Sequence, residues 1–124
     1  VKEIASNITF TGYIQDQELL QLYNKATLFL YPSYYEGFGI PPLEAQASGC
    51  PVIASNVASL PEVCGNSVLY CNPYDSNDIM NKVIDLYNDD ELRQDLIKKG
   101  FDNIQRFSWE KSARQMAGII SRFL

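Results

Sequence analysis

The sequence contains no histidine, and this absence removes several kinds of catalytic site. None of its 124 residues is His, so a Ser-His-Asp triad, a histidine general base and most zinc sites are excluded within this chain. Cysteine is also scarce, with three residues and no C-x-x-C spacing. An odd number of this kind does not suggest a disulfide framework, and a reduced, cytoplasmic setting is the simplest interpretation.

Clustered positive charge and long apolar runs are missing as well. Ten Lys and Arg residues stand against fifteen Asp and Glu residues, which gives a formal net charge of −5. The basic footprint of a nucleic-acid-binding protein and a polybasic membrane patch are therefore both absent. No apolar segment approaches the ~20 residues that span a bilayer. The composition, 46% hydrophobic and 20% charged, suits one globular domain with a real core.

Short apolar segments alternate with amphipathic ones, and this alternation predicts an α/β fold with a Rossmann-like parallel sheet. Strands are predicted at 7–12, 27–33, 51–55 and 67–71. Helices are predicted at 16–26, with Asp16 as N-cap, and at 41–49, with a turn at 59–65. The runs TLFLYPS and PVIAS are continuously apolar, which is typical of strands buried on both faces.

The C-terminal third predicts a helical tail. Its helices are expected at 76–89, 90–107 and 108–124, and they either cover one side of the sheet or reach toward another domain. In the last helix, Trp109 is expected to anchor the start against the core, and Met116 and Ile120 are expected to face inward. Residues 1–5 look like the last turn of a helix, so we expect the chain to be part of a longer protein.

Two glutamates flank a glycine-rich turn in the stretch YYEGFGIPPLEAQASGCPVIAS, residues 34–55. The turn follows a predicted strand and leads into a helix, where ligands bind in open parallel sheets. Free N–H groups and the helix dipole at such a start favour a phosphate. Glu36 can reach over the mouth of the site, and Glu44, expected in the first helical turn, can accept hydrogen bonds from two vicinal hydroxyls. Ribose, diphosphate and hexose would match this arrangement.

A purely structural interpretation has about equal weight on the pattern alone. A glutamate at the third helical position is a routine capping residue, and a glycine-rich turn before a helix is common.

The wider motif favours the ligand-binding interpretation. YEGFGIPPLEAQASGCPVIASNVASLPEVCG, residues 35–65, closely resembles the donor-binding motif of the retaining family-4 glycosyltransferases, in which E-G-F-G is followed after four residues by a helical Glu. The likeness extends to NITFTGYIQDQELLQLYNKATLFLYPS before it, and to SVLYCNPYDSNDI and RFSWEKSA after it. The resemblance therefore covers nearly the whole chain.

The resemblance implies a GT-B architecture, with residues 1–124 as part of the C-terminal nucleotide-sugar-binding domain. Glu36 would contact the donor hexose as the catalytic residue, and Glu44 would bind the ribose hydroxyls. The remaining donor-binding residues that it implies are Tyr13 at the base pocket, Gly37, Phe38, Gly39 and Ile40 beside the sugar and diphosphate, and Leu43 beside the nucleotide. No metal and no further cofactor is implied, since the nucleotide-diphosphate sugar is itself the donor substrate.

The same resemblance implies the partners and the parts that are missing. A saccharide or a lipid-linked molecule would be the acceptor, and the whole enzyme would be cytoplasmic, with peripheral association at the cytoplasmic face of a membrane as one option. An Arg and a Lys that neutralise the leaving diphosphate in the family would precede Val1. The alternative from another class is a non-catalytic α/β nucleotide-binding or scaffolding module that keeps both glutamates for structure.

The implied strand order, 3-2-1-4-5-6, would lack its first two strands in this chain. The predicted strands near 8–11, 28–31, 51–55 and 67–71 would be the third to the sixth. Either strand 8–11 closes the gap by pairing in parallel with 28–31, or another chain fills it and the protein is a homo-oligomer through its open sheet edges.

Overall fold

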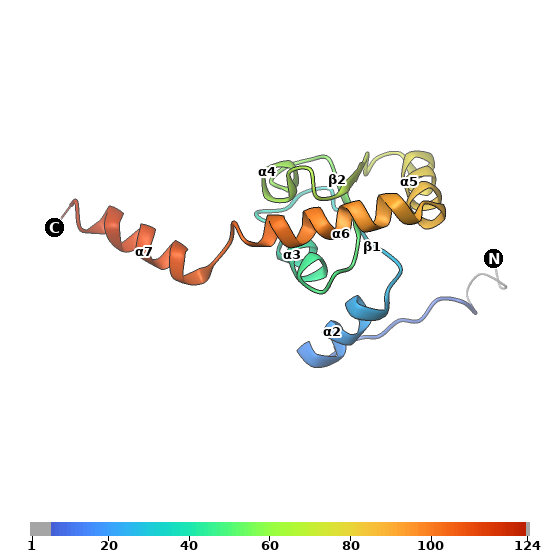
Figure 1. The fold of residues 1–124 in the computed structure, drawn as a ribbon, viewed down its shortest axis with the longest axis horizontal. Coiled ribbons are helices and arrows are strands. Elements are labelled where there is room, and N and C mark those ends of the chain that lie inside the picture. Colours follow the sequence, from blue (N-terminus) through green and yellow to red (C-terminus); the bar gives the residue numbers. More distant parts are fainter. Residues whose placement is uncertain (1–5, 124) are drawn as a thin grey trace.

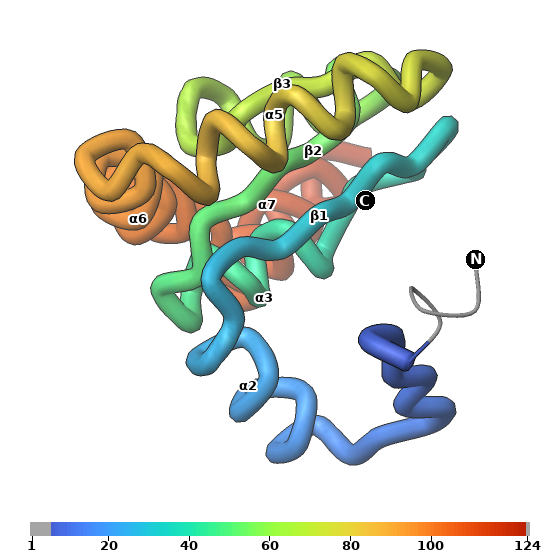
Figure 2. Tube along the Cα trace, turned by 90° about the vertical axis from the view of Figure 1, so that its right-hand side faces the viewer, coloured from blue at the N-terminus to red at the C-terminus, as the bar shows by residue number. Residues whose placement is uncertain are grey.

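The computed structural model describes residues 6–123 and contains a three-stranded parallel sheet with helices on both faces (Figures 1 and 2). The strands are β1 (Phe29–Tyr31), β2 (Val52–Ser55) and β3 (Leu69–Cys71), in the order β1-β2-β3. Leu30 pairs with Ile53 and Ile53 with Leu69 across the sheet. The order confirms that the predicted strands at 28–31, 51–55 and 67–71 are neighbours in chain order, and the α/β fold class with a parallel sheet and C-terminal helices is confirmed.

Six helices accompany the sheet in the described part of the chain. They are α2 (Asp16–Lys25), α3 (Ile40–Ala47), α4 (Leu60–Cys64), α5 (Ser76–Asn88), α6 (Asp90–Ile104) and α7 (Trp109–Ile120). Among the described residues, no helix combines the length and the hydrophobicity that a membrane span requires. The N-cap of α2 is Gln15, one residue before the predicted Asp16, and its capping box with Glu18 explains the shift.

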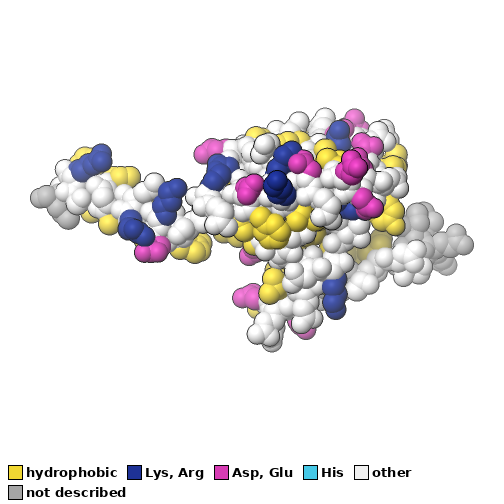
Figure 3. Space-filling model, in the orientation of Figure 1, with side chains coloured by type: hydrophobic (Ala, Val, Ile, Leu, Met, Phe, Trp, Pro, Cys, Tyr) yellow, Lys and Arg dark blue, Asp and Glu magenta, His cyan; other side chains and the backbone are white. Residues whose placement is uncertain are grey.

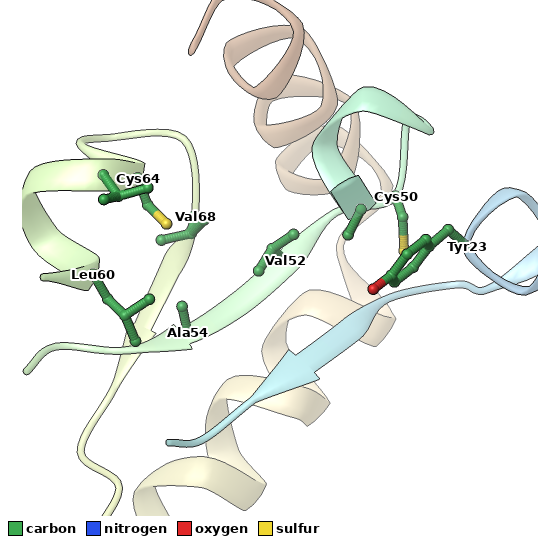
Figure 4. Packing of buried hydrophobic residues seen from close by; sticks show 9 residues of the cluster. Tyr23, Cys50, Val52, Ala54, Leu60, Cys64 and Val68 are labelled. Carbon is green, nitrogen blue, oxygen red and sulfur yellow. The ribbon is translucent and has the colours of Figure 1, made fainter. Parts of the chain in front are cut away.

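The sheet separates two apolar clusters, as the continuous apolar runs predict. On one face Val52 and Ala54 meet residues of α2, α3 and α4, among them Tyr23 and Leu60 (Figure 4). On the other face Ile53 meets residues of α5 and α6. Every residue of β2 is buried, because successive side chains of a central strand enter opposite clusters.

Helix α6 connects the two faces. Its first half packs in the cluster with α5, and its second half runs along α3. There a Cβ added to Gly100 would lie 3.1 Å from the Gln46 side chain, so the glycine permits the close approach of the two helices. The helix then ends near the N-terminus of α3, where the Phe107 and Phe38 rings meet edge to face at 5.7 Å. In this way the C-terminal part of the chain reaches the loop that carries the two glycines.

The predicted strand at 7–12 is wrong. Residues 8–12 form neither helix nor strand and are exposed, and β1 pairs with β2 alone. An extended segment needs a neighbour for its backbone groups, and the described chain brings none to this one, so apolar β-branched composition alone did not make a strand. Strand 8–11 therefore does not close the gap beside β1. Filling of this edge by another chain stays a prediction, and the expected helical turn at 1–5 lies outside the described residues.

The inward orientation predicted for the last helix is also wrong. Helix α7 extends away from the body of the molecule, with apolar and basic side chains both displayed along it (Figures 1 and 3). It contains no buried residue, and Trp109 is 86% exposed. Its start is as predicted, since the Ser108 side chain caps it at the amide of Lys111. The helix is amphipathic as predicted, but beyond its first turn, which borders a hollow beside the start of α3, its apolar side chains Met116 and Ile120 are exposed.

Candidate functional site

The glycine-rich loop lies between β1 and α3, at the carboxyl end of the sheet. The neighbouring β2–α4 connection fastens it, because the Ser59 hydroxyl lies 3.0 Å from the carbonyl oxygen of Glu36 and 2.9 Å from that of Phe38. The single hydroxyl proton is shared between these two acceptors. Ser59 and Glu36 are 23 positions apart, so no sequence motif indicated this contact.

Gly39 fixes the entry into α3. Its φ is +100°, and a Cβ at this position would stand 2.6 Å from Cδ2 of Leu60, a fully buried core residue. Both facts exclude an ordinary L side chain without rearrangement. A Cβ added to Gly37 would meet nothing within 4 Å, so packing requires a glycine at position 39 and not at position 37.

The start of α3 offers fewer amide donors than a typical helix. The helix begins at Ile40, and its second and third residues, Pro41 and Pro42, have no N–H group. The free amides at this end are those of Gly39 and Ile40, to which the loop adds its own. An anion here would bind at the positive end of the helix dipole through these few amides.

Glu36 is held by two hydroxyl groups. The Tyr31 hydroxyl donates to Oε1 at 2.6 Å, and the Ser33 hydroxyl donates to the same oxygen at 2.8 Å. These hydrogen bonds, the one from Tyr31 first, lower the pKa of Glu36 below its ordinary value. Burial, with a further contribution from the carboxylate, raises the pKa of Tyr31 to about 12. At neutral pH the pair is thus a carboxylate accepting from a neutral phenol.

Glu44 lies at the start of the second turn of α3, whereas the first turn was predicted. The helix begins at Ile40, so Glu44 is the fifth residue and does not act as an N-terminal cap. This placement contradicts the capping interpretation of the motif. Its exposed side chain lines a hollow of about 310 Å³ between α2 and α3, together with Asp16, Leu19 and Tyr23. Burial, and then the charge of Glu44, raises the pKa of Tyr23 to about 12.

A row of aromatic rings connects the surroundings of the two glutamates. Tyr23 meets Phe29 edge to face at 5.2 Å, and Phe29 stacks on Tyr31 at 5.8 Å. Tyr23 lies beside Glu44 and Tyr31 is bonded to Glu36. The two carboxylates are therefore positioned over the same side of the sheet, along the open edge strand β1.

The apolar residues of the motif line a different hollow. Phe38, Ile40 and Leu43 surround a space of about 400 Å³ together with Phe107, Ser108, Trp109 and Ser112. Trp109, which was expected in the core, is one wall of this space. The helical period of the tail predicted a helix there, but nothing in the pattern indicated that it would pass the glycine-rich loop.

Tyr13 does not line the hollow beside Glu44. Its side chain is 96% exposed and it precedes α2, so the proposed base-pocket role has no described neighbour to support it. Of the two other tyrosines near the motif, Tyr34 packs against Tyr74 with ring centroids 5.1 Å apart, and Tyr35 is 80% exposed.

The described residues form no ion pair with Glu36 or Glu44. Their three ion pairs lie within α6 and α7 and join Asp90 with Arg93, Asp95 with Lys99 and Glu110 with Arg114. No group of three His, Cys, Asp or Glu residues in the described part of the chain could hold a metal ion. The described site therefore offers two carboxylates as hydrogen-bond acceptors and a few backbone amides as donors.

Comparison with known proteins identifies the family. Residues 2–103 match the family described as glycosyl transferases group 1. The chain belongs to this family. It is 43% identical over 108 residues to O-antigen chain mannosyltransferase B of Escherichia coli, and 37% identical over 119 residues to the serotype-specific mannosyltransferase WbdA of the same species. These alignments cover 87% and 96% of this chain but only 28% and 15% of the relatives, so the chain spans less than a third of either protein.

The fold agrees with that of a solved structure. Sucrose-phosphate synthase from Thermosynechococcus elongatus superposes on 98% of this chain with a TM-score of 0.87 and 33% sequence identity, and the match covers 31% of that protein. This likeness supports the GT-B fold that the motif implied.

Proposed function

We propose that the protein containing this chain transfers a hexose from a nucleotide-diphosphate sugar to a saccharide or lipid-linked acceptor, with retention of configuration. The chain would be part of the C-terminal donor-binding domain. The observation that carries the proposal is the pair of carboxylates on one side of the sheet, with the glycine-rich loop and the start of α3 between them in sequence. Family membership supports sugar transfer in general, and the roles of single residues rest on the motif and the geometry.

In this proposal Glu36 accepts a hydrogen bond from a hydroxyl of the donor hexose. Its pKa is lowered, so at neutral pH it acts as an ionised acceptor. The amides of Phe38, Gly39 and Ile40 face the sugar and the diphosphate, and the dipole of α3 adds partial positive charge there.

Glu44 binds the ribose hydroxyls at the hollow between α2 and α3. An ionised carboxylate has two acceptor oxygens, and two vicinal hydroxyls can donate to them as a pair. The hollow of about 310 Å³ is open enough to admit a sugar ring beside Tyr23. Leu43 and Tyr13 are proposed to border the nucleotide.

Mannose is the first hexose to test. The relatives at 43% and 37% identity are mannosyltransferases by name, although each is far longer than this chain. The O-antigen chain named in one of them is a saccharide, which agrees with a saccharide acceptor for the protein proposed here.

Catalysis in this scheme consists of positioning the donor and stabilising departure of the nucleotide diphosphate. The described residues provide the positioning groups but no cation that pairs with either glutamate. The cations would come from elsewhere in the protein, and these 124 residues alone should not transfer sugar.

The test is a donor screen with the full-length protein. UDP, GDP and ADP are each paired with mannose and with glucose, and release of free nucleotide is measured with and without a saccharide acceptor. Acceptor-dependent release from one donor supports the proposal. Nucleotide binding without transfer to any acceptor would favour the alternative of a non-catalytic binding module.

A further inference from the structure

We propose that Tyr31 and Ser33 are positioning residues, which fix the Glu36 carboxylate so that Oε1 is occupied and Oε2 is presented to the donor sugar. The inference rests on the proposed function of Glu36. It assigns the roles of two hydroxyl groups outside the E-G-F-G motif, and it assigns the two carboxylate oxygens different tasks.

Tyr31 is anchored more firmly than an exposed residue would be. It belongs to β1, where it pairs with Ala54 of the central strand. Its ring stacks on Phe29 and packs against the buried cluster beneath α2 and α3. The hydroxyl therefore has a nearly fixed position, and a carboxylate that accepts from it at 2.6 Å takes its orientation from the sheet.

Ser33 completes the fixation from the loop itself. Its Oγ lies 2.8 Å from Oε1 of Glu36 and 3.1 Å from the carbonyl oxygen of Tyr35, so its one proton has two acceptors nearby. The carboxylate is the closer and the charged acceptor, and hydrogen bonds to charged groups are the stronger ones. Two donors on one oxygen restrain rotation of the carboxylate more than a single donor does.

The other carboxylate oxygen keeps its acceptor capacity. Within residues 6–123 no hydrogen bond reaches Oε2 of Glu36. An ionised carboxylate offers about four lone-pair sites, of which the two hydroxyl groups use those of Oε1. A sugar hydroxyl that donates to Oε2 would meet an acceptor that is already oriented, which is how supporting groups improve a binding constellation.

Ser59 has a separate task that the experiment must distinguish. It bonds the backbone carbonyls of Glu36 and Phe38 and makes no bond to the Glu36 side chain. Loss of Ser59 would loosen the loop as a whole, whereas loss of the Tyr31 hydroxyl would release the carboxylate alone.

The experiment uses Tyr31→Phe and Ser33→Ala in the full-length enzyme, with the best donor from the screen above. Each should lower kcat/KM for that donor about tenfold, while the affinity for the free nucleotide and the melting temperature change little. Ser33→Thr, which keeps a hydroxyl, should restore most of the loss. Tyr70→Phe is the matched control, since Tyr70 donates to the carbonyl of Gly65 and lies away from Glu36, and its kinetics should equal the wild type.

A double-mutant cycle with Glu36→Gln shows whether Tyr31 acts through Glu36. If it does, Tyr31→Phe should cost much less in the Glu36→Gln background than in the wild type. An undiminished loss there, or wild-type kinetics in both single variants beside a damaged Glu36→Gln, overturns the positioning roles and leaves the proposed function intact. Wild-type transfer by Glu36→Gln would instead overturn the proposed role of Glu36, and this inference with it.

Discussion

The Tyr31 hydroxyl lies 2.6 Å from Oε1 of Glu36, and this bond joins the buried sheet to the proposed donor site. Tyr31 is the last residue of β1, and Glu36 follows five positions later in the loop. The carboxylate is thereby held over the end of β1 without a cation. Its charge is stabilised by neutral hydroxyl donors, which leaves it available to accept from a substrate.

Glu36→Ala should lower sugar transfer by roughly ten- to a hundredfold while leaving free-nucleotide affinity almost unchanged. The reason is that Glu36 is proposed to touch only the hexose. Steady-state kinetics and calorimetric nucleotide binding with the full-length enzyme measure the two effects. Glu62→Ala, which removes an exposed glutamate of α4, is the control. Equal damage to transfer and to nucleotide binding would show that Glu36 supports the loop and has no role specific to the sugar.

Glu44→Ala, unlike Glu36→Ala, should weaken the binding of the free nucleotide. The ribose would lose a two-oxygen acceptor, and the free energy of nucleotide binding should become about 1–3 kcal/mol less favourable. Calorimetric titration of the full-length protein with the nucleotide diphosphate measures this free energy of binding. Glu91→Ala, at the exposed start of α6, serves as the control. A folded Glu44→Ala variant with wild-type affinity would rule out the ribose role.

Much of the fold could be predicted because its strongest signals are local. The apolar runs around β1 and β2 are long enough to be buried on both faces, and the helical periods of α5 and α6 are regular. The segment 7–12 and the helix α7 were misjudged for a common reason. Strand pairing and burial of an amphipathic side both depend on a neighbour, which composition cannot supply.

The residues of the motif could be predicted from the sequence, but the residues that hold the loop in place could not. Glu36, Gly39 and Glu44 stand out because residue type and spacing carry their chemistry. The supports come from contacts between distant positions, such as Ser59 on the loop carbonyls and Phe107 against Phe38. Such pairs need the folded chain, because each joins two segments that lie far apart in the sequence.

Gly39→Ala should destabilise the protein by about 1–3 kcal/mol, since it combines a left-handed backbone with a clash at Leu60. Gly37→Ala in the same loop is the matched control, because a Cβ there meets nothing within 4 Å. Urea unfolding followed by circular dichroism compares the two variants. Equal stability of both would show that the loop adapts around Gly39 without strain.

Asn103→Ala should cost about 1–3 kcal/mol of unfolding free energy, because it breaks a buried network. The Asn103 amide donates to the side chain of Gln46 at 2.9 Å and to the carbonyl of Val63 at 3.1 Å, and it accepts from Arg106. Asn81→Ala, on the exposed side of α5, should change stability by no more than about 0.5 kcal/mol. A small effect at Asn103 would mean that water replaces the amide.

The three cysteines should be unreactive in the folded protein and should make stability fall in alkali. Cys50, Cys64 and Cys71 are free and buried, and burial raises the pKa of Cys50 and of Cys64 from the ordinary 9.0 to about 11. An unfolded chain therefore releases these thiol protons at lower pH than the folded one. Between about pH 9 and 11 the unfolded state binds fewer protons, so the free energy of unfolding decreases as the pH rises, whereas below pH 9 this contribution is fully present.

Labelling at pH 8 with a thiol reagent checks the first part of this prediction. All three thiols should react quickly in denaturant and none before unfolding, because the thiolate is the reactive form and access is closed. Urea unfolding at a series of pH values checks the second part, and a Cys50→Ala variant should show a shallower decline above pH 9 because one of the three thiols with a raised pKa is gone. A stability that stays flat from pH 9 to 11 would show that these thiols titrate alike in the folded and unfolded chain.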